Sequence, residues 1–465
     1  DFIGTRYGGN LSRFLAVVVL TVASFTYVTA QINATGTIAS VALDIPFQYA
    51  VYVGLVSILL CSMLGGMRGV TWTQVAQYIV LIIAYLLPVF WISNEIGAGF
   101  FPHFMLADEV ARIGELEQQF GFVKNSAADL ANVPKGLAGI TKAHSAVNAT
   151  PWAFISLALA MMMGTASLPH VMMRYFTTPS VKAARKSVGW SLFFIFLLYS
   201  SAPMLATLSK LSLIDPSLPT GIIGKSIADV QAIDWYQNWN QANLMFVSDF
   251  NGNGTLELNE FFMGGKAVVL ATPEIAGLPY VISGLVAAGG MAAAMSTADG
   301  LVLAIANALS HDLYYKIIDP KAETAKRLIV ARVLLVIIGF AGATIAALEI
   351  QGILGSVIWA FDFAMSGLFF PLVLGVWWKR ANAQGAVAGM LLGLASGTAY
   401  LVWVRTGGAG FWGVTQLTFG IVGSLVSLVS MVVVSLITKA PDAATQKMVD
   451  EVRIPSGKTV LGKQH

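Results

Sequence analysis

Two hydroxyls and one carboxylate interrupt a long apolar stretch near the middle of the chain. Residues 288–303 read AGGMAAAMSTADGLVL, and Ser296, Thr297 and Asp299 are the polar groups in it. At helical spacing Ala293, Ser296 and Asp299 share one face. Hydroxyl and carbonyl oxygens suit a hard cation such as Na⁺, and the carboxylate would add charge or carry a proton. The alternative is that both hydroxyls donate to carbonyls one turn earlier, as hydroxyls in apolar helices commonly do.

The composition places this stretch in a protein that crosses a membrane many times. Of the 465 residues, 56% are hydrophobic and 11% are charged, against about 25% charged residues in soluble domains. The net charge is only +3, and the single cysteine, Cys61, excludes an intrachain disulfide and a cysteine-based metal cluster. We expect an all-α polytopic membrane protein whose surroundings are a lipid bilayer, with no nucleic-acid partner.

Ten apolar segments are long enough to span a bilayer, which takes about 20 residues. Two long polar excursions, 93–150 and 209–280, interrupt them, and a polar, basic tail begins at Lys439. The predicted transmembrane helices are 12–31, 47–66, 71–92, 152–173, 188–208, 281–309, 327–348, 354–377, 384–404 and 413–437.

Lysine and arginine residues set the expected orientation, because cytoplasmic loops carry an excess of them. Ten spans put both chain ends on the same side of the membrane. If the N-terminus is cytoplasmic, almost all lysine and arginine residues of the short loops also lie on the cytoplasmic side. The outer loops near 32–46 and 349–353 carry acids instead, and Arg174 is interpreted as an inner-surface anchor. We therefore expect a cell-membrane protein with both ends of this chain cytoplasmic and both excursions extracellular.

A second pattern lies in the excursion 209–280, where residues 249–260 read DFNGNGTLELNE. The spacing matches the calcium loop of an EF-hand, which places oxygen ligands around a sharp glycine turn. Three carboxylates predict modest affinity and a bracing role for the loop. The alternative is an Asn-Gly turn that matches by chance. The expected Ca²⁺ ligands are Asp249, Asn251, Asn253, Thr255, Glu257 and Glu260.

Four stretches of the chain resemble segments of the sodium:solute symporter family. MSTADGLVLAIANALSHDLY (295–314) is similar to its eighth core helix, and GGMRGVTWTQVAQ (65–77) to the start of its fifth. GTASLPHVMMRYFT (164–177) resembles its sixth, and WWKRANAQGAVAGMLLG (377–393) the connection after its tenth. These matches are distributed over nearly the whole chain apart from the excursions. The chain looks closest to the acetate and monocarboxylate permease-like branch.

The resemblance implies the leucine-transporter-like fold, in which two inverted five-helix repeats hold substrate and ions near the membrane midplane. It also implies that core helices one and two are missing, so that the chain is N-terminally truncated. The expected divisions are core helices three to five (1–92), an extracellular excursion (93–150), core helices six and seven (151–208), a second excursion (209–280), core helices eight to ten (281–377), two peripheral helices (378–437) and a cytoplasmic tail (438–465).

The resemblance also implies one sodium site within the opening stretch. Ala293 would offer its main-chain carbonyl to one Na⁺, and Ser296 and Thr297 would offer their hydroxyls.

A second ion site rests on a departure from the family pattern. The family often has Thr-Asp at the start of helix five, where this chain has Thr73-Gln74, and its glucose-transporting branch has threonine where this chain has Asp299. We hypothesise that the carboxylate has moved between these two helices. Asp299, Gln74 and Thr73 would then form a second cation site or a proton site.

Substrate contacts are expected where the sixth core helix is broken. Thr165 and Ser167 precede Pro169, which would open the helix backbone, and freed amides and hydroxyls there could hold a carboxylate. Asp362 is the other carboxylate well inside a span. It could contact substrate, take part in a gate, or pair with Arg332 or a helix end.

The expected function is cation-coupled symport by alternating access, with Na⁺ as the coupling ion and a small organic solute, a monocarboxylate such as acetate, as the cargo. The sequence has no phosphate-binding loop, hydrolase metal motif or nucleophile elbow, so we expect no enzyme activity. The alternatives are a transporter-like sensor or receptor and a cation channel. The solute, the choice of Na⁺ or H⁺, and a small membrane partner subunit are left open.

Overall fold

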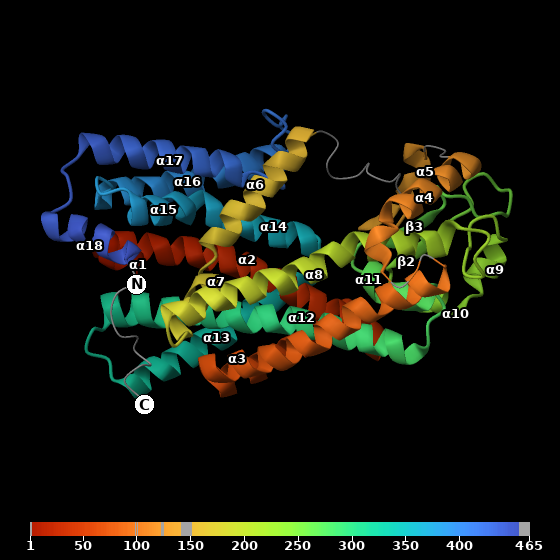
Figure 1. The fold of residues 1–465 in the computed structure, drawn as a ribbon, viewed down its shortest axis with the longest axis horizontal. Coiled ribbons are helices and arrows are strands. Elements are labelled where there is room, and N and C mark those ends of the chain that lie inside the picture. Colours follow the sequence, from red (N-terminus) through yellow and green to blue (C-terminus); the bar gives the residue numbers. More distant parts are fainter. Residues whose placement is uncertain (1, 98, 100, 122–124, 141–150, 455–465) are drawn as a thin grey trace.

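Helices run along the long axis of the molecule, and shorter elements gather at one end of it (Figure 1). This computed structural model describes residues 2–97, 99, 101–121, 125–140 and 151–454. The elements from the two excursions lie together at one end, which we call the cap. Helices α1 (Phe2–Tyr7) and α18 (Ala443–Arg453) lie at the opposite end (Figure 1).

Eight helices of the described residues are long and apolar enough to cross a membrane, and a bent pair would make a ninth. The pair is α6 (Pro151–Ser167) with the segment Pro169–Tyr175, bent by 51°. The eight spans are α2 (Asn10–Leu43), the second part of α3 (Arg68–Glu95), α8 (Val181–Ile214), α12 with η3 (Tyr280–Ile318), α13 (Thr324–Ala347), α14 to α15 (Ile353–Trp377), α16 (Ala383–Arg405) and α17 (Gly420–Ile437).

The eight spans, the bent pair and one shorter apolar helix correspond to the ten expected segments. The predicted span 47–66 is the shorter apolar helix Phe47–Met63, which forms the first part of α3 (Phe47–Glu95). Non-helical φ and ψ angles at Gly66 separate it from the second part. A positive φ of 51° suits glycine, which has no Cβ to clash there.

The first predicted span also ends later than expected. The outer loop expected at 32–46 is mostly helix, because α2 continues to Leu43. Its later residues are small or hydroxylic, and Thr35 and Thr37 donate their hydroxyls to carbonyls of the same helix. This internal bonding lets polar residues stay within an apolar helix.

The innermost helices approach one another closely because they carry small residues. Helices α2, α3 and α12 (Tyr280–Asn307) pack together, and α14 (Ile353–Ala364) packs on α2. A Cβ added to Gly289 would lie 2.4 Å from the side chain of Ala84, and one added to Gly36 would lie 2.6 Å from Val51. Glycine at these positions allows the close helix contacts that membrane bundles use.

The cap adds a small β-sheet to a chain that was expected to be all-α. Strand β1 (Leu137–Gly139) comes from the first excursion and pairs antiparallel with β3 (Phe261–Gly264) from the second, which also pairs with β2 (Met245–Val247). The sheet thus ties the two excursions together. The other elements of the cap are η1 (Pro102–Phe104), α4 (Leu106–Phe120), α5 (Ala127–Ala131), α9 (Ile227–Gln231), α10 (Asp234–Gln241) and α11 (Val268–Ile275).

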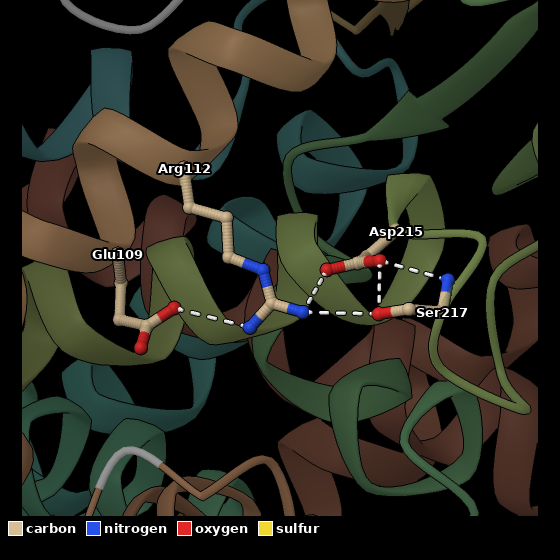
Figure 2. A network of polar contacts seen from close by, with 4 residues as sticks. All are labelled: Glu109, Arg112, Asp215 and Ser217. Carbon is tan, nitrogen blue, oxygen red and sulfur yellow. Dashed lines mark hydrogen bonds and ion pairs between the residues drawn. The ribbon is translucent and has the colours of Figure 1, made fainter.

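An ion-pair network fastens the cap to the end of α8 (Figure 2). Arg112 on α4 pairs with buried Asp215, the residue that follows α8, and donates to the Ser217 hydroxyl at 3.1 Å. Asp215 accepts from the main-chain N–H and the hydroxyl of Ser217 at 2.9 and 2.6 Å. Glu109 lies 3.8 Å from Arg112. The network joins residues of both excursions, so it restrains the cap as a unit.

Part of the C-terminal tail is helical. Helix α18 forms within the tail that was expected to be solvated, and Asp450 pairs with Lys379 at 2.7 Å. Arg453 lies over the ring of Trp377, 5.5 Å from its centroid. Residues 455–465 lie outside the described part of the chain.

Candidate functional site

The helix break expected near Pro169 is confirmed. Helix α6 ends at Ser167, Leu168 takes extended angles (φ −74°, ψ 118°), and α7 (Pro169–Met172) begins at the proline. Proline disfavours a helical conformation of the residue before it, which accounts for the angles of Leu168. The short helix η2 (Met173–Thr177) follows and carries Arg174. The break therefore directs a new helical segment back toward α12 and α3.

The three atoms expected to bind Na⁺ lie together on α12. The hydroxyl of Ser296 donates to the carbonyl oxygen of Ala293 at 2.9 Å, and the hydroxyl of Thr297 donates to the same oxygen at 3.4 Å. The hydroxyls thus bond back along their own helix, as the alternative reading of the sequence proposed. The same bonds also gather three oxygens at one point of α12.

Gln74 on α3 connects this point of α12 to the broken helix. Its Nε2 donates to the main-chain carbonyl of Ser296 at 2.5 Å, and its Oε1 accepts from the guanidinium of Arg174. A Cβ added to Gly300 would lie 2.8 Å from Nη2 of Arg174, so the absent side chain leaves room for the guanidinium. Three segments that are far apart in sequence therefore meet around Gln74.

A cavity of about 330 Å³ opens at this meeting point. His170 contributes to its wall and also packs edge-on against Tyr27, with 5.7 Å between ring centroids. The wall combines hydroxyl, amide, imidazole and guanidinium groups, so it can bind a polar solute. The lining residues are Gln74, Gln77, Tyr78, Leu81, His170, Val171, Arg174, Ser296 and Thr297.

Asp299 lies about one helical turn after Ser296 on α12 and is fully buried. Ser62 on the first part of α3 donates its hydroxyl to Oδ1 at 3.0 Å. Within the described residues, the other carboxylate oxygen, Oδ2, accepts no hydrogen bond from the protein. Arg174 is a basic side chain whose charge acts on this carboxylate. The structure thus gives Asp299 one hydrogen-bond partner, Ser62, and a nearby basic side chain, Arg174, that the sequence did not indicate.

Three other predicted site residues bond within their own helices. The hydroxyl of Thr73 donates to the carbonyls of Gly69 and Val70, at 3.1 and 3.0 Å. Thr165 and Ser167 each donate to a carbonyl one turn earlier on α6, both at 2.7 Å. None of the three is among the residues that line the cavity.

Asp362 lies at a helix end instead of at the cavity. Its side chain is fully buried on α14, and a Cβ added to Gly420, the first residue of α17, would lie 2.7 Å from its Oδ1. The main-chain N–H groups of Phe419 and Gly420 lie beside the carboxylate without forming hydrogen bonds of good geometry. A carboxylate there complements the positive end of the helix dipole. Of the roles considered for Asp362, the structure favours pairing with a helix end.

Arg174 is the main site residue that sequence reasoning missed. It was expected at the inner surface as an anchor, and the structure places it, half-buried, against Gln74 and Gly300. Its position in the sequence held a usable signal. Arg174 comes only five residues after Pro169, too few to carry it away from the middle of a broken span.

The EF-hand-like loop has much of the expected backbone geometry but different surroundings. Asp249 accepts main-chain N–H bonds from Gly252, Asn253 and Gly254, at 2.8, 3.2 and 2.9 Å. Glu260 is fully buried and accepts from the N–H groups of two loop residues. The loop is flanked by strands β2 and β3, whereas an EF-hand has helices there.

The carboxylates of the loop are not gathered for metal binding in this conformation. Across the part of the chain that the structure describes, no group of three or more His, Cys, Asp or Glu side chains could hold a metal ion. Asn251 and Asn253 instead donate their side-chain amides to Glu257, each at 2.9 Å. Ca²⁺ binding would require these amides to turn their oxygens inward.

Comparisons with known proteins agree with this arrangement of helices. The chain is 33% identical to an uncharacterized symporter of Cupriavidus necator over 547 aligned positions, which cover 97% of this chain and 79% of that protein. It is 28% identical to a monocarboxylic acid transporter of Corynebacterium glutamicum over 380 positions, which cover 80% of this chain and 59% of that protein.

A solved structure shares the fold. It is a Na⁺-coupled sialic acid symporter in a substrate-bound, outward-open state, with a TM-score of 0.61 and 16% identity over 95% of this chain and 77% of the other. The fold is thus of the leucine-transporter type, as expected. The proteins that the chain resembles are transporters and not enzymes. Residues 1–213 and 266–393 match the model of the Sodium:solute symporter family. This chain belongs to the sodium:solute symporter family.

Proposed function

We propose that this protein is a sodium-coupled symporter that moves a small monocarboxylate, such as acetate, across the membrane by alternating access. The observation that carries the proposal is the meeting of α12, α3 and the broken helix at one polar cavity. Ser296 and Thr297 line this cavity, and their hydroxyls donate to the Ala293 carbonyl. Family membership supports Na⁺ as the coupling ion.

The sodium site would use the three oxygens gathered on α12. Both hydroxyls now donate to the carbonyl of Ala293, so they would have to turn their protons away to share it with a cation. Rotation about a C–O bond is all this requires, because a hydroxyl has one donor and two acceptor lone pairs. The remaining ligands would come from the facing helices.

Two observations support a small carboxylate as the cargo. A relative is a monocarboxylic acid transporter, and the cavity of about 330 Å³ suits a small solute. The described residues that line the cavity include no Asp or Glu, so an anion meets no repelling acid at the wall. Thr165 and Ser167 at the helix break remain candidates for contact with the cargo in a further state of the cycle.

The membrane setting and the loop 249–260 complete the proposal. Positive charge in the connections at the α1 and α18 end supports a cytoplasmic placement of that end, which would put the cap outside the cell. An extracellular loop with weak affinity could fill with Ca²⁺ and brace the cap. Asp249, which accepts a hydrogen bond from a main-chain N–H of the loop, and the buried Glu260 support this role.

Uptake of labelled acetate into proteoliposomes tests the proposal. An inward Na⁺ gradient should drive accumulation above the external concentration, and an equal K⁺ gradient should not. A channel would equilibrate the solute without accumulating it, and a sensor would bind it without flux. Either of those two outcomes would contradict the proposed symport.

A further inference from the structure

Asp299 poses a problem of charge. It is fully buried, Ser62 satisfies one of its oxygens at 3.0 Å, and Oδ2 accepts no hydrogen bond from the described residues. An ionised carboxylate in a membrane interior needs a positive partner. In a transporter, a cation bound beside the carboxylate could be that partner. The sequence left open whether this partner is a second cation, a proton or neither.

A positive group lies beside the residue that follows Asp299 on α12. The guanidinium of Arg174 lies against Gly300, the residue next to Asp299, at 2.8 Å from where a Cβ would stand. Arg174 exerts its charge on Asp299, and Gln74 orients it through Oε1. An arginine stays protonated and offers five N–H donors in a fixed plane, so it can act on two neighbours at once.

Among the described residues, a neutral side chain bonds to Arg174 and another bonds to Asp299. Gln74 is neutral, and it links Arg174 to the carbonyl of Ser296 without adding charge. Ser62 is likewise neutral. A second Na⁺ beside Asp299 would therefore meet the positive guanidinium, and the repulsion would act at short range in a medium of low dielectric constant.

We propose that Arg174 is the built-in counter-cation of Asp299, so that the protein couples transport to one Na⁺ and has no second cation at Asp299. The inference rests on the proposed function, because it concerns the coupling ratio of that symport. It makes Arg174 a positioning residue that sets stoichiometry, with Gln74 holding its side chain in place. The carboxylate that would attract a second Na⁺ is present but lies in the electric field of this guanidinium.

The test is the Na⁺-to-acetate ratio of the full chain in proteoliposomes, measured from the outward acetate gradient that just stops net flux at a fixed inward Na⁺ gradient, with the membrane potential held at zero. The wild type should give a ratio of one. Arg174→Gln should free Asp299 for a second cation, so the Hill coefficient for Na⁺ should rise from about one toward two. Arg174→Gln combined with Asp299→Asn should return it to about one. Arg185→Gln, at an exposed position of α8, is the control and should change neither value.

A wild-type ratio of two would overturn the inference and leave the proposed function intact. Wild-type uptake that does not depend on Na⁺ would overturn both the inference and the proposed function. If Arg174→Gln does not fold, the double variant decides the question, because removing both charges should restore melting temperature and a ratio of one. A double variant that stays as impaired as Arg174→Gln would also overturn the inference.

Discussion

The side-chain amide of Gln74 on α3 donates to the main-chain carbonyl of Ser296 on α12, with 2.5 Å between nitrogen and oxygen. The same side chain accepts from Arg174, which lies after the break between α6 and α7. Movement of the broken helix relative to α12 must therefore strain or break a bond made by Gln74. The proposed sodium site would therefore lie on a contact between moving parts if the proposed alternating access moves the broken helix relative to α12.

The hydroxyls of Ser296 and Thr297 should determine the affinity for Na⁺. Replacing both, as Ser296→Ala with Thr297→Val, removes two proposed ligands and should raise the Na⁺ concentration for half-maximal uptake by roughly tenfold or more. Thr398→Val is a matched control, because that hydroxyl also bonds back along its helix, at 2.7 Å, and is remote from the cavity lining. An unchanged Na⁺ dependence in the double variant would exclude these hydroxyls as ligands.

The family pattern on α12 could be predicted from the sequence, and the partner of Asp299 could not. Ala293, Ser296 and Thr297 follow one another on a single helix, so local spacing determines how they meet. Arg174 lies beside Gly300, the neighbour of Asp299, because the chain bends by 51° between α6 and the segment that follows. Pro169 predicts such a break but not the direction in which the next residues point.

The surroundings of Asp362 and the β-sheet of the cap could not be predicted from the sequence either. Asp362 stood out as a carboxylate within a span, but its place at the start of α17 depends on how α14 and α17 pack. The β-sheet of the cap was missed because its three strands are three or four residues long. Runs that short carry little periodicity, and two of the strands come from the same excursion while the third comes from the other.

The ion pair between Arg112 and Asp215 should stabilise the cap. Arg112→Gln would leave buried Asp215 without its cation, at a cost of roughly 1–3 kcal/mol. The melting temperature in detergent should fall, and proteolysis within the cap should become faster. Lys135→Gln removes an exposed cation from the same region and serves as the control. If both variants melt alike, the network in Figure 2 does not fasten the cap.

Glu274 in the cap should make stability depend on pH. Burial raises the pKa of its carboxyl group, and the hydrogen bond from Trp239 Nε1 at 2.8 Å opposes that shift in part. A raised folded-state pKa gives stability that is complete below the unfolded pKa and is lost as pH rises through the folded pKa. Glu274→Gln keeps an acceptor for Trp239 and removes the charge.

The variant Glu274→Gln should therefore melt at a higher temperature than the wild type near neutral pH. The two proteins should converge in acid, below the ordinary pKa of glutamate. Melting curves recorded across that pH range provide the measurement. A stability difference that grows as the pH falls would have the wrong sign and would reject the explanation by burial.

Calcium should raise the melting temperature of the wild type at millimolar concentrations, because a ligand that binds only the folded state stabilises it by mass action. Glu260→Gln should abolish most of that increase. Asp229→Asn, an exposed acid on the neighbouring helix α9, should leave it unchanged. Equal Ca²⁺ responses in the wild type and Glu260→Gln would show that the loop 249–260 is a structural turn.

Coupling between Na⁺ and the carboxylate is the central claim, and reciprocal flux tests it most directly. Linked fluxes drive each other in both directions, so an inward acetate gradient should drive ²²Na⁺ into proteoliposomes that start with equal Na⁺ on both sides. The predicted result is transient ²²Na⁺ accumulation that requires acetate and is strongly reduced, at the same Na⁺ concentration, when Ser296 and Thr297 are replaced together. Acetate entry without any ²²Na⁺ movement would contradict the account.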